Sequence, residues 1–203
     1  MLRILFADRV ENWPLYQAPL AEALAAMGLE AELVLPEACA PETVDYIIYS
    51  PRGPVQDFSA YTRVKLVQSL WAGVERVVGN ATLSQPLARM VDDGLAKGMV
   101  EWVAGHVLRY HLRIDHFLAH QDGVWQQAGN VPPLAEDRAV TVLGLGELGA
   151  ASARMLAHLG FRVTGWSRSA KDIAGVTCLH GMGQLPAALG GAEILVTLLP
   201  NTP

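Results

Sequence analysis

Cysteine and positive charge are both scarce in this chain. Its two cysteines, Cys39 and Cys178, lie in different segments with no metal-ligand or redox spacing, which favours buried, reduced thiols. The chain has 15 Lys and Arg residues against 20 Asp and Glu, a net charge of -5 and a pI of about 5.6. Binding to nucleic acid needs a basic surface, so no nucleic-acid partner is expected.

Long apolar runs are also missing. No stretch reaches the roughly eighteen apolar residues of a membrane span, and the N-terminal apolar run stops at Asp8, which favours a first strand over a signal peptide. We therefore expect a soluble, cytoplasmic protein without a membrane partner. A composition of 51% hydrophobic and 17% charged residues is still sufficient for the buried cores of one or two domains.

Strand and helix patterns alternate along the N-terminal half. Strands are predicted at residues 2–7, 31–35, 46–49 and 64–69, and a helix around 15–27 that ends at Gly28. Such alternation favours a parallel sheet with helices on its faces. Residues 1–98 are therefore predicted to form an α/β domain of their own.

A polar, glycine-containing stretch at residues 91–98 separates this region from a helical pattern at 99–121, where Val100, Val103 and Val107 recur at helical spacing. We expect one long helix that bridges two domains. Residues 99–203 are predicted to contain this helix and the first part of a dinucleotide-binding domain.

The segment from Val140 to Gly149 holds the most informative motif. A β-branched run enters Gly144-x-Gly146-x-x-Gly149, a helix-forming stretch leaves it, and a second apolar run follows at residues 161–166. Gly144 permits a tight turn, Gly146 lets the backbone approach a pyrophosphate, and Gly149 lets the helix pack on the strand. The alternative is a tight turn without a ligand. The predicted cofactor-binding residues of this turn are Gly144, Leu145, Gly146, Glu147, Leu148 and Gly149.

The end of the second apolar run indicates which dinucleotide binds. Domains that bind NAD usually carry an Asp or Glu there, but this chain has Ser167 and Arg168. An acid would repel the 2′-phosphate of NADP, whereas a hydroxyl and a guanidinium can bind it. NADP(H) is therefore predicted to be preferred over NAD(H), which the same turn can also accept. The predicted cofactor-binding residues here are Trp166, Ser167, Arg168 and Ser169.

A short apolar piece near residues 176–179, a helix around 183–189 and a strand at 193–199 complete the pattern. A dinucleotide-binding domain of two mononucleotide halves needs more strands than these. We therefore expect the nucleotide domain to be incomplete and the chain to be a fragment.

The order of the segments resembles the D-isomer-specific 2-hydroxyacid dehydrogenases, and among them the glyoxylate/hydroxypyruvate reductase A branch. The resemblance implies an α/β protein with two doubly wound parallel-sheet domains, a flavodoxin-like substrate domain without its closing helix and a Rossmann-type nucleotide domain. The matching segments are 68–75, 98–103, Trp125, 143–149, 166–168 and 198–203.

This resemblance also implies an activity: reduction of a short 2-oxoacid such as glyoxylate or hydroxypyruvate by hydride from NADPH, in a homodimer. In the family, the loop matching Trp71, Ala72 and Gly73 binds the substrate carboxylate through backbone N–H groups. A glycine-containing loop after a strand can form such an anion-binding nest, although an ordinary turn with a buried Trp is the alternative. The nicotinamide ribose is expected near Leu199, Pro200, Asn201 and Thr202.

No catalytic residue is expected within this chain, because the family's catalytic Arg, His and acid match positions beyond Pro203. The chain alone is therefore predicted to be inactive. His116 and His120 have the i, i+4 spacing of a metal pair, but no third ligand is suggested nearby, so a helix face is favoured and no metal is expected. The alternative function is a non-catalytic dinucleotide-binding protein with a regulatory or interaction role.

Overall fold

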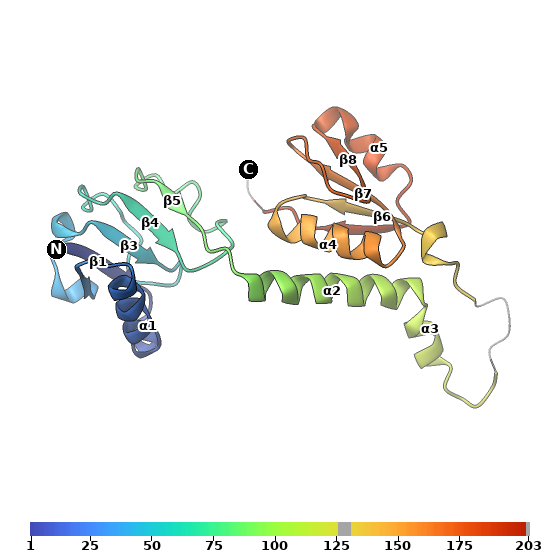
Figure 1. The fold of residues 1–203 in the computed structure, drawn as a ribbon, viewed down its shortest axis with the longest axis horizontal. Helices are drawn as coiled ribbons and strands as arrows, with labels where there is room; N and C mark the ends of the chain where they lie inside the picture. The colour runs from blue at the N-terminus through green and yellow to red at the C-terminus, as the bar shows by residue number, and fades with distance from the viewer. Residues whose placement is uncertain (126–130, 202–203) are drawn as a thin grey trace. The chain divides into compact units, whose positions relative to one another are not determined.

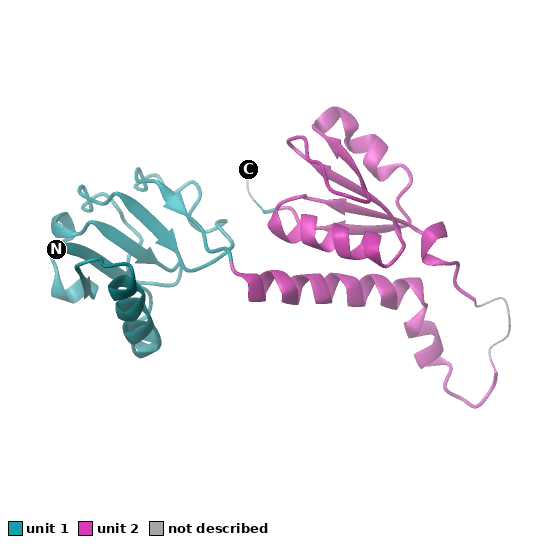
Figure 2. Ribbon diagram, in the orientation of Figure 1, with its two compact units in different colours: residues 1–91, 200–203 teal, residues 92–199 magenta. Residues whose placement is uncertain are grey.

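The computed structural model describes residues 1–125 and 131–201, which form two compact units: Met1–Val91 together with the segment from Pro200, and Asp92–Leu199 (Figure 2). The change from one unit to the other comes between Val91 and Asp92, earlier in the chain than the expected boundary after Gly98. Each unit contains its own sheet and its own hydrophobic core. The expected α/β class with two parallel sheets is confirmed.

The first unit contains one five-stranded parallel sheet with the order β2-β1-β3-β4-β5 (Figure 1). This is the flavodoxin-like strand order, in which the direction of winding reverses between β1 and β3. Its helix α1 spans Trp13–Ala26. The strands are β1 Leu2–Ala7, β2 Ala31–Val34, β3 Tyr46–Tyr49, β4 Leu66–Ser69 and β5 Leu87–Ala88.

The central strands of this sheet are fully buried on one face. Leu5, Ile47 and Val67 are fully buried on β1, β3 and β4, and Tyr49 packs on Phe58 with 5.4 Å between ring centroids. On β1 the residues of the other face are buried as well, which explains its continuous apolar run. The predictions for β1 and β3 are confirmed at both ends. Strand β5, with two residues, gave no signal in the sequence.

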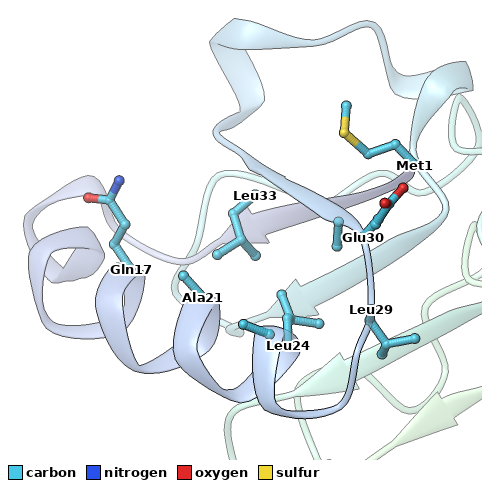
Figure 3. Close-up of a pocket in the computed structure, with 9 residues that line it drawn as sticks. Met1, Gln17, Ala21, Leu24, Leu29, Glu30 and Leu33 are labelled. Atoms are coloured by element: carbon cyan, nitrogen blue, oxygen red, sulfur yellow. The ribbon is translucent and has the colours of Figure 1, made fainter.

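Helix α1 and the edge strand β2 border an open groove (Figure 3). The helix is apolar along most of its length, yet none of its residues is fully buried. Leu24 of α1 and Leu33 of β2 line the groove together with Leu29 in the connection between them. The residues that line this groove do not include a set of charged side chains that could perform chemistry.

The second unit contains a four-stranded parallel sheet with the order β8-β7-β6-β9. In sequence order this is 3-2-1-4, the first part of the Rossmann arrangement. Its strands are β6 Ala139–Leu143, β7 Arg162–Ser167, β8 Val176–His180 and β9 Ile194–Thr197, and its helices are α2 Asp93–His111, α3 Ile114–Ala119, α4 Glu147–His158 and α5 Leu185–Leu189. Short 3-10 helices in the two units span Val10–Asn12, Pro36–Ala38, Pro41–Thr43, Ala135–Asp137 and Met182–Gln184.

The single long helix expected at residues 99–121 is wrong in two respects. Helix α2 begins at Asp93, because the Asp92 side chain accepts a hydrogen bond from the Leu95 N–H at 2.8 Å and caps the helix. The expected linker at residues 91–98 is therefore largely the first part of this helix. Helix α2 ends at His111, and Arg113 has a left-handed backbone (φ 54°) that separates it from α3.

Helix α2 packs beside α4 within the second unit (Figure 1). Val103 and Val107 of α2 join Leu156 of α4 and Val142 of β6 in the core of this unit. Within residues 1–125 and 131–201, no helix has the length and apolar character needed to cross a membrane.

Candidate functional site

The turn after β6 takes a shape that only glycine accommodates. Gly144 has φ 97°, and its N–H donates to the carbonyl of Trp166 on β7 at 2.8 Å. A Cβ at this position would lie 2.8 Å from the carbonyl oxygen of Leu198, which follows β9. The turn is therefore closed against the ends of two neighbouring strands, and a larger residue would force them apart.

The other two glycines of the motif differ in their surroundings. A Cβ on Gly149 would lie 1.7 Å from the carbonyl oxygen of Gly144, so α4 packs directly on the turn. A Cβ on Gly146, the residue before α4, would meet nothing within 4 Å. The backbone at the start of α4 is therefore open on one side, where free N–H groups of the first helical turn can bind an anion.

The interior side of this turn is filled by Leu145, which is 2% exposed. Its side chain lies over Gly165 of β7, where a Cβ would be 2.6 Å from the Leu145 Cδ2. Of the six residues expected in this turn, Leu145 thus faces the core. Gly146 and Glu147 are exposed.

Strand β7 ends beside this turn with two buried residues, and two exposed residues follow it. Trp166 is buried and its indole N–H donates to the Gly181 carbonyl at 2.8 Å. Ser167 is also buried, and its hydroxyl donates to the Ser169 carbonyl at 2.7 Å. Arg168 and Ser169 are exposed. Because the Ser167 proton is already engaged, Arg168 and Ser169 are the residues here with donors facing solvent.

A histidine for which the sequence suggested no partner lies next to this strand end. The parallel register of β7 and β8 pairs Ser167 with His180, which is exposed at the end of β8. The backbone N–H of His180 donates to the Gln184 side chain at 2.7 Å. Only strand register, which the sequence pattern did not define, brings His180 beside Ser167.

The expected oxoacid-binding loop follows β4 in the first unit. The Trp71 N–H donates to the Ser69 hydroxyl at 3.0 Å, and the Trp71 carbonyl accepts from the Met90 N–H at 3.2 Å. Trp71, Ala72 and Gly73 are all half-buried. A Cβ on Gly73 would lie 2.6 Å from a carboxylate oxygen of Glu75, so this flexible acid folds over the loop.

A small polar cavity of about 150 Å³ lies at the carboxyl ends of β1, β3 and β4. This is the edge of a doubly wound sheet at which ligands bind, beside the β1/β3 switch point. The Arg52 guanidinium carbon lies 5.1 Å from the ring centroid of Trp71, in cation–π geometry. Residues that line the cavity include Asp8, Arg9, Asn12, Ser50, Arg52 and Trp71.

Asp8 is the buried acid of this cavity. Burial raises the pKa of its carboxyl, but hydrogen bonds from Asn12, at 2.7 Å, from the Arg9 N–H and from Ser50 outweigh burial. The nearby Arg9 charge acts in the same direction, so the Asp8 pKa lies below its usual value. Asp8 is therefore ionised near neutral pH and its charge is held by these partners.

The remaining expected site residues follow β9 or lie on α3. Leu199, Pro200 and Asn201 come after β9 at the carboxyl edge, and Thr202 lies outside the described residues. His120 Nδ1 is 2.7 Å from the His116 carbonyl, so this ring contacts its own helix backbone. In the described part of the chain, no three His, Cys, Asp or Glu residues are placed to hold a metal ion.

Comparisons with known proteins agree on one family. The model of the D-isomer-specific 2-hydroxyacid dehydrogenase NAD-binding domain matches residues 104–203. A glyoxylate/hydroxypyruvate reductase A of Yersinia enterocolitica is 36% identical over 172 residues, which are 80% of this chain and 53% of that protein. One of Serratia proteamaculans is 36% identical over 160 residues, or 75% of this chain and 50% of that protein. The chain thus spans about half the length of the curated relatives it matches.

Two solved structures extend the similarity to the whole chain. A 2-hydroxyacid dehydrogenase of Xanthobacter autotrophicus in complex with NADPH is 35% identical with a TM-score of 0.80, over 99% of this chain and 64% of that one. An NADPH-dependent glyoxylate/hydroxypyruvate reductase of Sinorhizobium meliloti in complex with NADP is 31% identical with a TM-score of 0.76, over 100% and 64%. The chain belongs to the D-isomer-specific 2-hydroxyacid dehydrogenase family, within which it is similar to the glyoxylate/hydroxypyruvate reductases A.

Proposed function

We propose that the complete protein reduces a short 2-oxoacid of the glyoxylate or hydroxypyruvate type to the D-2-hydroxyacid, with NADPH as the reductant. The observation that carries this proposal is the glycine turn after β6, closed at Gly144 and Gly149 and open at Gly146, next to the exposed Arg168. NADPH, when bound, supplies the hydride for the 2-carbon of the oxoacid. Two similar structures are complexes with NADPH or NADP, which supports this choice.

Residues of the second unit, and of the segment that follows it, would hold the cofactor. The N–H groups at the start of α4, in residues 146–149, bind the pyrophosphate. The guanidinium of Arg168 and the hydroxyl of Ser169 bind the 2′-phosphate, which makes NADP(H) the preferred cofactor while NAD(H) stays acceptable. Leu199, Pro200, Asn201 and Thr202 are proposed to lie along the nicotinamide ribose.

Residues of the first unit would hold the oxoacid, which makes this unit the substrate domain and the second unit the nucleotide domain. Backbone N–H groups of Ala72 and Gly73 bind the substrate carboxylate, and the indole of Trp71 forms a wall of the pocket. The Glu75 side chain, which lies over this loop, would have to move for the substrate to bind. We assign proton donation to no residue of this chain, and we expect the 203-residue chain alone to be inactive.

We also propose that the protein is a cytoplasmic homodimer. Trp102, His106 and Tyr110 follow one another at i, i+4 spacing on α2 and form what we call the α2 stripe. Trp102 and Tyr110 are 64% and 66% exposed, and the Trp102 and His106 rings stack at 4.1 Å. Exposed aromatic side chains in a row are typical of the centre of a protein–protein interface.

The test is NADPH oxidation by the complete protein, followed by the loss of NADPH absorbance with glyoxylate and with hydroxypyruvate. Oxidation that depends on the oxoacid, with a D-configured product, is the expected result. Tight NADPH binding without oxidation by either acid would contradict the proposal. That outcome would instead support a non-catalytic dinucleotide-binding role.

A further inference from the structure

The small cavity at the carboxyl ends of β1, β3 and β4 contains more charge than recognition of a single carboxylate requires. Arg9 and Arg52 supply two positive charges and the ionised Asp8 supplies one negative charge. Asp8 is engaged by Asn12 at 2.7 Å. No ion pair of Arg52 is found among residues 1–125 and 131–201. The cavity therefore has an excess of one positive charge for a ligand.

The walls of the cavity hold its charged groups in place. The Arg52 guanidinium lies 5.1 Å from the Trp71 ring, and its backbone N–H is 3.4 Å from the hydroxyl of the buried Ser50. Phe6 of β1 packs on Tyr16 of α1 with 5.2 Å between centroids, which fixes the helix side of the cavity. A guanidinium stacked on an aromatic face keeps its N–H edge free for a carboxylate.

Trp71 belongs both to this cavity and to the loop proposed to bind the oxoacid carboxylate. A ligand bound at Ala72 and Gly73 would therefore direct its other end past the indole into the cavity. Its volume of about 150 Å³ corresponds to about five water molecules at ~30 Å³ each, enough for one further small polar group.

We propose that this cavity is a subsite for a negatively charged distal group, with Arg52 as the residue that selects short 2-oxodicarboxylates over 2-oxoacids whose distal group is uncharged. The inference rests on the proposed function, because it names the substrate class of that same site. It predicts that oxaloacetate, in which a carboxylate replaces the hydroxyl of hydroxypyruvate, is the better substrate.

The kinetic test compares oxaloacetate with hydroxypyruvate in the complete protein. Arg52→Gln should lower the ratio of their kcat/KM values about tenfold, since a charge-assisted hydrogen bond is lost only with the dicarboxylate. Arg52→Lys should restore part of the ratio, because it keeps the charge without the planar stacking. An Arg52→Gln ratio equal to that of the unaltered protein would overturn the inference.

Lys65→Gln is the matched control. The Lys65 ammonium lies 5.9 Å from the Tyr46 ring centroid, so this variant also removes one charge and one cation–π contact. It does so just before β4, at the opposite edge of the sheet from the cavity. The kcat/KM ratio of this variant should match that of the unaltered protein, and thermal unfolding of both variants would check that they fold.

Calorimetric titration with succinate and with butyrate separates this inference from the proposed function. Succinate binding that is weakened by Arg52→Gln, with butyrate binding weak throughout, supports the subsite even if no oxoacid is reduced. Oxoacid reduction with equal responses of both acids to Arg52→Gln supports the function and refutes the subsite.

Discussion

Gly149 of α4 lies against the carbonyl oxygen of Gly144: a Cβ on Gly149 would be 1.7 Å from that oxygen. The first turn of α4 is thereby fixed to the end of β6. This contact positions the open N–H groups of the helix, so the packing of one glycine determines where an anion can bind.

Gly149→Ala should destabilise the protein by about 1–3 kcal/mol, because the backbone of α4 must move away from the turn to make room for the methyl group. Urea unfolding would measure the loss. Gly98→Ala is the control, since Gly98 lies on α2 with nothing within 4 Å of its Cβ position. That variant should be as stable as the original or up to about 1 kcal/mol more stable. Equal stability of the two variants would show that α4 does not pack as described.

Gly146→Ala should separate folding from cofactor binding. Gly146 has φ -74°, which alanine adopts without strain, and its Cβ position is open. The variant should therefore unfold at nearly the same urea concentration as the unaltered protein. Its methyl group would occupy the space proposed for the pyrophosphate, so calorimetry should show NADPH affinity reduced about tenfold or more, a loss of ~1.4 kcal/mol. Unchanged NADPH affinity would refute the proposed pyrophosphate position.

Arg168→Ala should reduce affinity for NADPH and leave affinity for NADH nearly unchanged. The guanidinium is exposed at the end of β7, where only the 2′-phosphate of NADP would use it. A loss of about tenfold for NADPH is expected from one charge-assisted contact in solvent. Arg154→Ala, which removes an exposed charge from the middle of α4, is the control. Parallel losses for NADPH and NADH in Arg168→Ala would show that Arg168 does not read the phosphate.

The sequence was most informative where one local pattern determines the structure. Strands β1 and β3 were predicted to their end residues, because each is an apolar run bounded by polar or turn-forming residues. The glycine turn was equally predictable, since Gly144 and Gly149 each have a steric reason to be there.

Helix α2 shows where the local pattern was insufficient. Gly94 and Gly98 suggested a linker, but the Asp92 cap and the packing of Val103 and Val107 favour helix through both glycines. No proline or glycine marks the end of α2 in the sequence. The residue with the left-handed backbone that follows this helix is Arg113.

The polar cavity was not anticipated for a different reason. Its residues follow three strands that are distant in sequence, and no two of Asp8, Ser50 and Trp71 belong to one motif. Only the strand order, which places β1, β3 and β4 side by side, brings these side chains together. Arg52, between Pro51 and Gly53, had the pattern of an ordinary turn.

His111 should make the stability of the protein depend on pH near neutrality. Burial lowers the pKa of this histidine, and the charge of Arg138 lowers it further. The unfolded chain therefore binds a proton more readily than the folded protein as the pH falls below about 6.5. The contribution of the neutral His111 to the free energy of unfolding is present in full above that pH and is lost progressively below it. One such group contributes a slope of at most ~1.4 kcal/mol per pH unit.

His111→Phe should remove this part of the pH dependence. The His111 ring packs edge-on to Phe161 at 4.9 Å, and its Nδ1 has no hydrogen-bond partner among the described residues, so an aromatic apolar ring suits the site. Urea unfolding between about pH 7.5 and about pH 5.5 would measure the change in slope. His158→Phe, at an exposed position of α4, should keep the original slope. A slope that persists in His111→Phe would exclude this histidine as its source.

Trp102→Glu should dissociate the proposed homodimer. The Trp102 side chain is 64% exposed in the single chain, and a carboxylate at the centre of an aromatic interface would have to be buried without a partner. Truncation of a central Trp typically weakens association by 2 kcal/mol or more, which is about 30-fold in Kd. Sedimentation at a series of protein concentrations would measure the shift from dimer to monomer. Met182→Glu, at a residue 71% exposed and away from the α2 stripe, provides the matched control and should leave the dimer intact. If both variants remained dimeric with unaltered Kd, the contact between subunits would have to lie on a surface other than the α2 stripe.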